Sequence, residues 1–223
     1  MIGLVCSVTD EASGLINHIK KRKFFKYSNI EIISGLINNK KIILVISGVG
    51  KVNAAHATTF FILKYRPEII INFGIAGAFP GSGVSIGDIA IAEREIYADE
   101  GIYMTRGFSD MRFIGIPLLK TSNGKALYNE IVFNEGLLAS VVNSLRKKGH
   151  LVKKGNFITV STVTATKDRA DYLRKRYRPL CESMEGAAVA HVCVMHGVEC
   201  LEVRGISNFV GPRNRKAWDI NAA

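Results

Sequence analysis

The chain has 223 residues, of which 30 are lysine or arginine and 19 are aspartate or glutamate, so its formal charge is +11. Hydrophobic residues make up 48% and charged residues 22%, which excludes a mainly disordered chain and allows one compact core. The composition therefore predicts a single globular domain over residues 1–223.

The first half of the chain alternates apolar runs with helical patterns. Ala12, Leu15, Ile16 and Ile19 repeat with the period of an amphipathic helix. Asn38-Asn39 separates two β-rich runs and favours a hairpin turn. In chain order the patterns predict strand 2–8, the helix containing Ala12 to Ile19, strands 30–37 and 41–47, helix 51–65, strand 69–73 with a glycine-rich loop at 74–77, and strand 89–96.

The second half continues the alternation of strands and helices. Its predicted elements are helix 135–148, strand 157–163, helix 168–177, helix 185–196 and strand 201–206. Residues 101–127 mix glycine, arginine and aromatic residues and give no clear pattern. The alternation indicates an α/β fold, a three-layer α/β/α domain with a central mixed sheet and helices on both of its faces.

The basic residues occur in short runs at 20–23, 146–148 and 174–176. Each run is expected to close a helix, where cations interact favourably with the helix dipole. Because the sequence contains no evident basic stripe interleaved with aromatic residues, it predicts no nucleic-acid partner. A nucleic-acid-binding module stays as an alternative, with salt-sensitive binding as its mark.

Residues 1–8 lack a basic leader and are soon followed by Asp10, so the sequence predicts a cytoplasmic protein without a signal peptide. The charge-free stretch 69–87 is interrupted by glycines and a proline, which argues against a membrane span. His191, Cys193 and His196 are spaced to scatter around a helix, so no metal site is expected. Reduced thiols are expected for all four cysteines, Cys6, Cys181, Cys193 and Cys200.

Two glycine motifs are incomplete as nucleotide-binding signatures. Gly50-Lys51 resembles the end of a P-loop, but Val45 replaces its first glycine and Val52 its serine or threonine. Gly48-Val49-Gly50 has Asn53 at the third glycine position of a dinucleotide fingerprint. The sequence therefore predicts neither an ATP nor an NAD cofactor.

Three polar residues, Glu11, Glu185 and Asn208, stand at element ends or beside small residues. Segments 47–55, 72–77, 183–192 and 204–208 resemble the purine nucleoside phosphorylase and nucleosidase superfamily, and they span almost the whole chain. The resemblance implies a nucleoside phosphorylase-like fold and a homo-oligomer, for which residues 101–127 are the candidate contact.

Within the superfamily, the chain resembles the nucleosidases and most closely the futalosine hydrolases. The segments that carry this similarity are 160–166, 182–188 and 208–219. The resemblance implies hydrolysis of the N-glycosidic bond of futalosine, a step of menaquinone biosynthesis, with release of hypoxanthine and without a cofactor. A methylthioadenosine/S-adenosylhomocysteine nucleosidase and a phosphate-dependent purine nucleoside phosphorylase are the alternatives.

The resemblance also implies roles for individual residues. Glu11 matches the group that activates the attacking water, and Glu185 matches the acceptor of the ribose hydroxyls, with Met184 against the sugar. Both carboxylates have a simpler interpretation as charges at helix N-termini. Gly77, Ala165 and Thr166 match further substrate-binding positions, the last two through their main chain.

Asn208 occupies a position that is aspartate in the methylthioadenosine nucleosidases. Its amide nitrogen can donate to a purine 6-oxo group while its carbonyl accepts from N7–H, whereas a 6-amino group would face a second donor. The residue thus predicts a 6-oxopurine substrate. A turn-forming asparagine after a strand is the simpler interpretation.

Water is expected as the nucleophile. Phosphorylases of the superfamily carry phosphate-binding arginines in segments that correspond to 5–12 and 69–77, and neither segment contains an arginine here. Ile75 also stands where those enzymes have a serine or similar donor. Arg213 and Arg215 are candidates to pair with the benzoate of futalosine, and the C-terminal helix that is common in relatives is expected to be missing or different.

Overall fold

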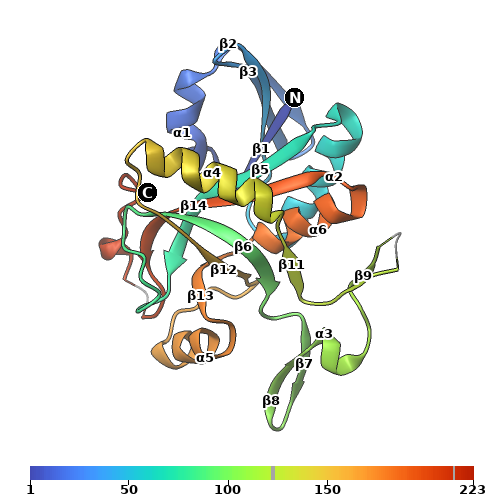
Figure 1. The fold of residues 1–223 in the computed structure, drawn as a ribbon, viewed down its shortest axis with the longest axis vertical. Coiled ribbons are helices and arrows are strands. Elements are labelled where there is room, and N and C mark those ends of the chain that lie inside the picture. Colours follow the sequence, from blue (N-terminus) through green and yellow to red (C-terminus); the bar gives the residue numbers. More distant parts are fainter. Residues whose placement is uncertain (122–123, 213) are drawn as a thin grey trace.

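The computed structural model describes residues 1–121, 124–212 and 214–223, without the side chain of Arg215, so the expectation for Arg213 and Arg215 lies outside the described part. A mixed sheet with flanking helices forms the molecule (Figure 1). The first elements are β1 (Ile2–Cys6), α1 (Thr9–His18), β2 (Lys20–Tyr27), β3 (Ile30–Ile37), β4 (Lys40–Ile46), α2 (Lys51–Tyr65), β5 (Ile69–Ala78) and β6 (Ile89–Tyr97).

The segment without a clear sequence pattern contains small elements, which are β7 (Gly101–Met104), β8 (Gly107–Asp110), α3 (Met111–Ile114), β9 (Leu119–Lys120) and β10 (Ala126–Leu127). The remaining elements are β11 (Glu130–Val132), α4 (Glu135–Lys147), β12 (Val152–Thr159), α5 (Lys167–Tyr177), β13 (Pro179–Ser183), α6 (Gly186–His196), β14 (Glu199–Phe209) and a 3-10 turn, η1 (Arg215–Ala217). In the described residues after β14, this turn is the one regular element.

The sheet is mixed, as predicted. Its strand order is β11-β6-β12-β13-β5-β1-β4-β3-β2, and β14 pairs with both β5 and β6. β1 runs parallel to β4 and β5, and β14 runs parallel to β5. β13 is antiparallel to β5, so the end of β13 meets the end of β5 at Glu182 and Gly77.

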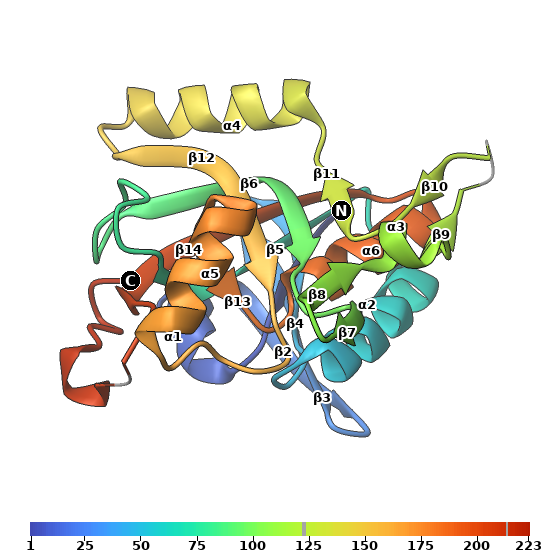
Figure 2. The same cartoon turned by 90° about the horizontal axis from the view of Figure 1, so that it is seen from below.

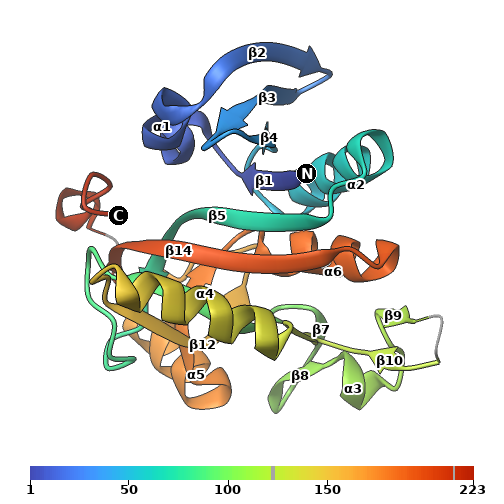
Figure 3. The ribbon, with the colours of Figure 1, turned by 45° about the horizontal axis from the view of Figure 1, so that its top comes forward.

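Helices cover both faces of the sheet because side chains on a strand alternate between its faces. On β1, Val5 packs in the same core as Phe61 of α2, whereas Leu4 and Cys6 pack with Ala12 of α1. α2 and α6 lie side by side, and Figure 3 shows α1 on the other side of β1 from α2. α4 runs along β12 and β6 (Figure 2). The predicted three-layer α/β/α architecture is confirmed.

Three predicted strands have wrong boundaries, and the one predicted at 201–206 spans Glu199–Phe209. β5 does not end at residue 73 but continues to Ala78, because its neighbour β14 remains paired with it through the glycines. The strand predicted at 157–163 lies at Val152–Thr159 instead, since its polar first half still pairs with β6. Residues 74–77 are therefore part of the sheet.

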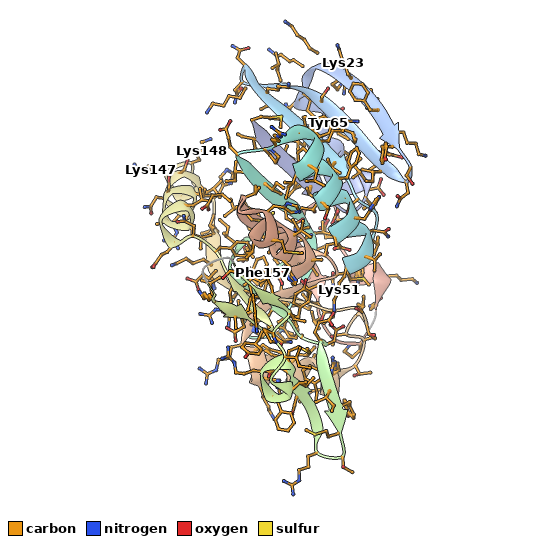
Figure 4. The ribbon with its side chains drawn as sticks, turned by 90° about the vertical axis from the view of Figure 1, so that its right-hand side faces the viewer. Lys23, Lys51, Tyr65, Lys147, Lys148 and Phe157 are labelled. Carbon is orange, nitrogen blue, oxygen red and sulfur yellow. The ribbon has the colours of Figure 1, made fainter. Side chains whose placement is uncertain are left out.

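The basic run 20–23 was predicted to close a helix, and this prediction is wrong. The run begins β2, an edge strand of the sheet. All eight side chains of β2 are exposed, and five basic residues there accompany three aromatic ones. The runs at 146–148 and 174–176 do lie at the ends of α4 and α5. Figure 4 shows Lys23 and Lys147 at separate places on the molecule, so the basic runs do not form one patch. β2 by itself nevertheless combines exposed basic and aromatic side chains, which was not expected from the sequence. Among the described helices, none has the length and apolar composition of a membrane span.

Candidate active site

A cavity of about 450 Å³ opens where the ends of β1, β5, β12, β13 and β14 meet. Strands that end at one edge of an α/β sheet bring sequence-distant side chains together. Six of the seven residues predicted from the sequence line this cavity, and they are Glu11, Gly77, Ala165, Met184, Glu185 and Asn208. The fold therefore gathers residues from five separate segments at one place.

Glu11 lies in the first turn of α1, and its carboxylate is held from two sides. Oε2 accepts hydrogen bonds from the Ser7 N–H at 2.9 Å, the Ser7 hydroxyl at 2.7 Å and the Val8 N–H at 3.3 Å. Oε1 accepts from the Ile75 N–H of β5 at 2.9 Å. The bonds to Ser7 and Val8 are those of a helix N-terminal glutamate. The bond to β5 fixes the same group at the cavity.

Glu185 directly precedes α6 and is buried, with 6% of its surface exposed. Its Oε1 accepts from the Gly50 N–H at 2.8 Å, and its Oε2 from the Met184 N–H at 3.3 Å. Burial raises the pKa of the Glu185 carboxyl, while the charge of Arg204 and the Gly50 hydrogen bond oppose the rise. A buried acceptor with few partners is suited to bind a donor such as a sugar hydroxyl.

Asn208 lies within β14, not in a turn after it, and the main chain opposite it is Gly77. A Cβ atom at Gly77 would lie 3.1 Å from Asn208 Nδ2, so glycine there leaves space for the amide. The Ser207 hydroxyl donates to Asn208 Oδ1 at 2.9 Å, and Asn208 Nδ2 donates to the Phe209 carbonyl at 3.1 Å. These two bonds fix which end of the amide is the donor.

Thr166 is not among the described residues that line the cavity, whereas its neighbour Ala165 is. The Thr166 hydroxyl accepts from the Arg169 N–H at 3.3 Å and caps the N-terminus of α5. This contact involves only the side chain, so the expected contribution of the Thr166 main chain to substrate binding stays a prediction. An N-cap threonine satisfies an otherwise unpaired N–H of the first helical turn, and this holds it at the helix.

Two charged residues near the cavity had no predicted role. Arg204 of β14 is 1% exposed and lies opposite Gly74 of β5. A Cβ atom added at Gly74 would overlap Glu11 Oε1 and would lie 2.7 Å from Arg204 Nη1, so the two side chains meet at this glycine. Burial alone would lower the pKa of Arg204, but the carboxylates around it raise it. Glu182 lines the cavity and accepts from the Thr164 N–H at 2.9 Å. Desolvation raises the pKa of Glu182.

The described cavity wall contains three carboxyl groups, those of Glu11, Glu182 and Glu185, and no lysine or arginine. Such a wall stabilises developing positive charge and repels anions. Cleavage of an N-glycosidic bond develops positive charge on the sugar ring. In the described residues, no group of three or more histidine, cysteine, aspartate or glutamate side chains could hold a metal ion.

The sequence is similar to those of known proteins. A profile of the phosphorylase superfamily matches residues 1–223. A futalosine hydrolase of Acidothermus cellulolyticus is 35% identical over 181 residues, which cover 81% of this chain and 69% of the relative. A 5′-methylthioadenosine/S-adenosylhomocysteine nucleosidase of Halalkalibacterium halodurans is 28% identical over 219 residues, which cover 98% of this chain and 89% of the relative.

Solved structures agree in fold. The 5′-methylthioadenosine/S-adenosylhomocysteine nucleosidase from Neisseria meningitidis, in complex with methylthio-immucillin-A, has a TM-score of 0.84 at 21% identity. The alignment covers 100% of this chain and 92% of the other. The futalosine hydrolase of Helicobacter pylori has a TM-score of 0.82 at 23% identity, covering 97% and 88%. The chain therefore belongs to the phosphorylase superfamily and is, like these relatives, a nucleosidase.

Proposed function

We propose that this nucleosidase hydrolyses the N-glycosidic bond of futalosine and releases hypoxanthine. The observation that carries the proposal is the orientation of the Asn208 amide in the cavity. Its oxygen already accepts from Ser207 and keeps a second lone pair, and its nitrogen keeps a second hydrogen. The free lone pair matches N7–H of a leaving 6-oxopurine, and the free hydrogen matches its O6.

The relatives at 33% and 35% identity that bear the name futalosine hydrolase support this substrate. A second candidate is methylthioadenosine/S-adenosylhomocysteine nucleosidase activity, which relatives that align over 98% of this chain favour. That reaction releases adenine, whose 6-amino group would point a donor at the Asn208 amide. A buried donor without an acceptor costs about 1–3 kcal/mol, which favours the oxo base.

In the proposed reaction, Glu11 takes a proton from the attacking water and Glu185 accepts hydrogen bonds from the ribose hydroxyls. The departing purine takes its N7 proton from solvent water, since the Asn208 amide orients the base and supplies no proton. Four hydrogen bonds hold the Glu11 carboxylate in one position, as a general base requires. Phosphate is a poor nucleophile here because the described wall of the cavity offers it carboxylates and no cation. These features support hydrolysis over phosphorolysis.

The test is a base-release assay in phosphate-free buffer with futalosine, inosine and methylthioadenosine, in which chromatography identifies the released base. The proposal predicts hypoxanthine from futalosine at a rate that added phosphate does not increase. Release that requires phosphate would indicate a phosphorylase. Rapid release of adenine with no reaction of futalosine would favour the second candidate.

A further inference from the structure

Behind the cavity, the sheet contains a buried cluster of charged side chains to which the proposed reaction gives no direct role. The cluster consists of Glu95 on β6 and of Glu202 and Arg204 on β14, with exposed fractions of 0%, 0% and 1%. Arg204 Nε donates to Glu202 Oε1 at 2.8 Å. Charges are costly in a protein interior unless their hydrogen-bonding atoms find partners.

In Glu95 and in Glu202, one carboxyl oxygen accepts hydrogen bonds and the other does not. Glu95 Oε2 accepts from the Thr159 hydroxyl at 2.8 Å and the Ile96 N–H at 3.2 Å, and Glu202 Oε1 accepts from Arg204. Among the described residues, neither Glu95 Oε1 nor Glu202 Oε2 has a donor. The oxygens of an ionised carboxylate only accept hydrogen bonds. Two carboxyl groups can therefore form a hydrogen bond with each other only when one of them carries a proton.

The two leftover oxygens converge at the start of α6. A Cβ atom at Gly186 would overlap Glu95 Oε1 and would lie 2.5 Å from Glu202 Oε2, so both oxygens stand around one point. The absence of a side chain at Gly186 lets the two carboxyl groups approach the helix together. Both oxygens therefore lie near the same point between β6 and β14.

Charge balance favours the same arrangement. Arg204 interacts electrostatically with Glu202, Glu185 and Glu11, and also with Glu95. One buried cation cannot compensate four ionised carboxylates in a medium of low dielectric constant. Burial, followed by repulsion from Glu202, raises the pKa of Glu95.

We propose that Glu95 is protonated on Oε1, donates to Glu202 Oε2, and forms with Glu202 a positioning element for Arg204. Glu202 remains ionised as the counter-charge of Arg204, which lies beside the cavity carboxylate Glu11. The Glu95–Glu202 pair thereby fixes the position of the Arg204 side chain next to Glu11.

The same pair is connected to α6. The Thr159 hydroxyl donates to Glu95 and accepts from the Ala187 N–H at 2.7 Å, in the first turn of the helix. Glu185 directly precedes that turn. A change at the pair is therefore expected to move both Glu11, through Arg204, and Glu185, through the helix.

The test compares Glu95→Gln with Glu202→Gln. A glutamine at 95 is neutral and donates the same hydrogen bond, so kcat and thermal stability stay close to those of the parent enzyme. A glutamine at 202 removes the counter-charge of Arg204, and a displacement of about 1 Å in a catalytic group lowers kcat on the order of 10²-fold. KM changes much less. Glu93→Gln is the matched control, because Glu93 lies on β6 but pairs with Lys154 near the surface at 2.8 Å.

Infrared spectroscopy of the unliganded enzyme in D₂O at neutral pH supplies the independent readout. The proposal predicts a protonated-carboxyl band in the parent enzyme that Glu95→Gln loses and Glu93→Gln keeps. An identical spectrum for Glu95→Gln, or full kcat in Glu202→Gln, would overturn it. If Glu202→Gln does not fold, the infrared comparison decides. The kinetic readout rests on the proposed function, whereas the infrared band does not, so the two proposals can fail separately.

Discussion

At the scale of single residues, Glu11 combines two roles that the sequence presented as alternatives. Its carboxylate bonds to the N–H groups of Ser7 and Val8, as a helix N-terminal charge does, and also reaches the Ile75 N–H at the cavity. The structural role thus fixes the orientation that the proposed chemistry needs. A group held this way loses little entropy when a water binds to it.

Glu11→Gln keeps the size of the side chain and removes its basicity. We expect kcat to fall by about 10²–10⁴, and stability to fall by about 1–3 kcal/mol because the glutamine NH2 would face a backbone N–H on either side, as measured by steady-state kinetics and thermal unfolding. Asp10→Asn is the control, because Asp10 is an exposed charge in the same helical turn. Equal kcat values for the two variants would show that Glu11 acts merely as a helix charge.

The raised pKa of Glu185 allows a prediction of how kcat/KM depends on pH. Because burial raises its pKa, its carboxylate takes up a proton at a higher pH than an exposed glutamate does. The ribose hydroxyls would then lose an ionised acceptor as the pH falls, so kcat/KM should decrease at a pH above the ordinary glutamate range. A pH profile of Glu185→Gln should lack this limb. An unchanged limb in that variant would assign the titration to another group.

At the scale of elements, glycines in β5 and at the start of α6 make the polar contacts possible. Gly74 gives space to Glu11 and Arg204, Gly77 to Asn208, and Gly186 to Glu95. β5 therefore remains a strand while side chains from α1 and β14 cross its surface. The arrangement requires a strand without Cβ atoms at the points of crossing.

Gly74→Ala should consequently impair the site. Its Cβ would collide with Glu11 and Arg204, so we expect a loss of about 1–3 kcal/mol in stability together with reduced kcat. Gly14→Ala is the counterpart, since a Cβ at Gly14 in α1 meets nothing within 4 Å and should stabilise the helix by about 0.5–1 kcal/mol. Chemical denaturation and kinetics of both variants measure this contrast.

Elements with one clear periodicity were predictable from the sequence, whereas those defined by their neighbours were not. The apolar repeat from Ala12 and the buried run at Ile69 predicted α1 and the start of β5 correctly. β2 has no apolar face, and the extension of β5 depends on its pairing with β14, so local pattern could not indicate them.

In the candidate site, too, some residues could be located from the sequence whereas others depend on how the strands pair. Motifs within single segments located Glu11, Glu185 and Asn208, which the fold brings together. Arg204 stood in a matched segment, yet its place opposite Gly74 follows from strand register, which a single sequence does not contain. The role expected for the Thr166 main chain stays a prediction, while its side chain forms the N-cap of α5, as a threonine directly before a helix commonly does.

At the scale of the whole molecule, the described residues 101–121 and 124–127 form a projection of small elements beside the main sheet (Figure 1). Tyr103, Phe113 and Ile116 in this segment are 81%, 64% and 60% exposed. Exposed apolar side chains gathered in one segment are typical of protein contacts. They support the expectation that this segment joins copies of the chain.

Light scattering should therefore give a mass that is a multiple of the 24.5 kDa chain, and Tyr103→Asp combined with Phe113→Asp should lower it. Leu151→Asp, at an isolated residue that is 80% exposed, is the control and should leave the mass unchanged. A parent protein that is monomeric at assay concentration, or a mass that responds only to Leu151→Asp, would contradict this assignment.

The central claim is that the Asn208 amide selects a 6-oxopurine. Its most direct test is the ratio of kcat/KM for futalosine to that for methylthioadenosine, measured without phosphate in the parent enzyme and in Asn208→Asp. We expect the parent ratio to be well above one and the substitution to lower it by about 5- to 150-fold, equivalent to about 1–3 kcal/mol. A parent enzyme that prefers methylthioadenosine, or a ratio that the substitution leaves unchanged, would contradict the account.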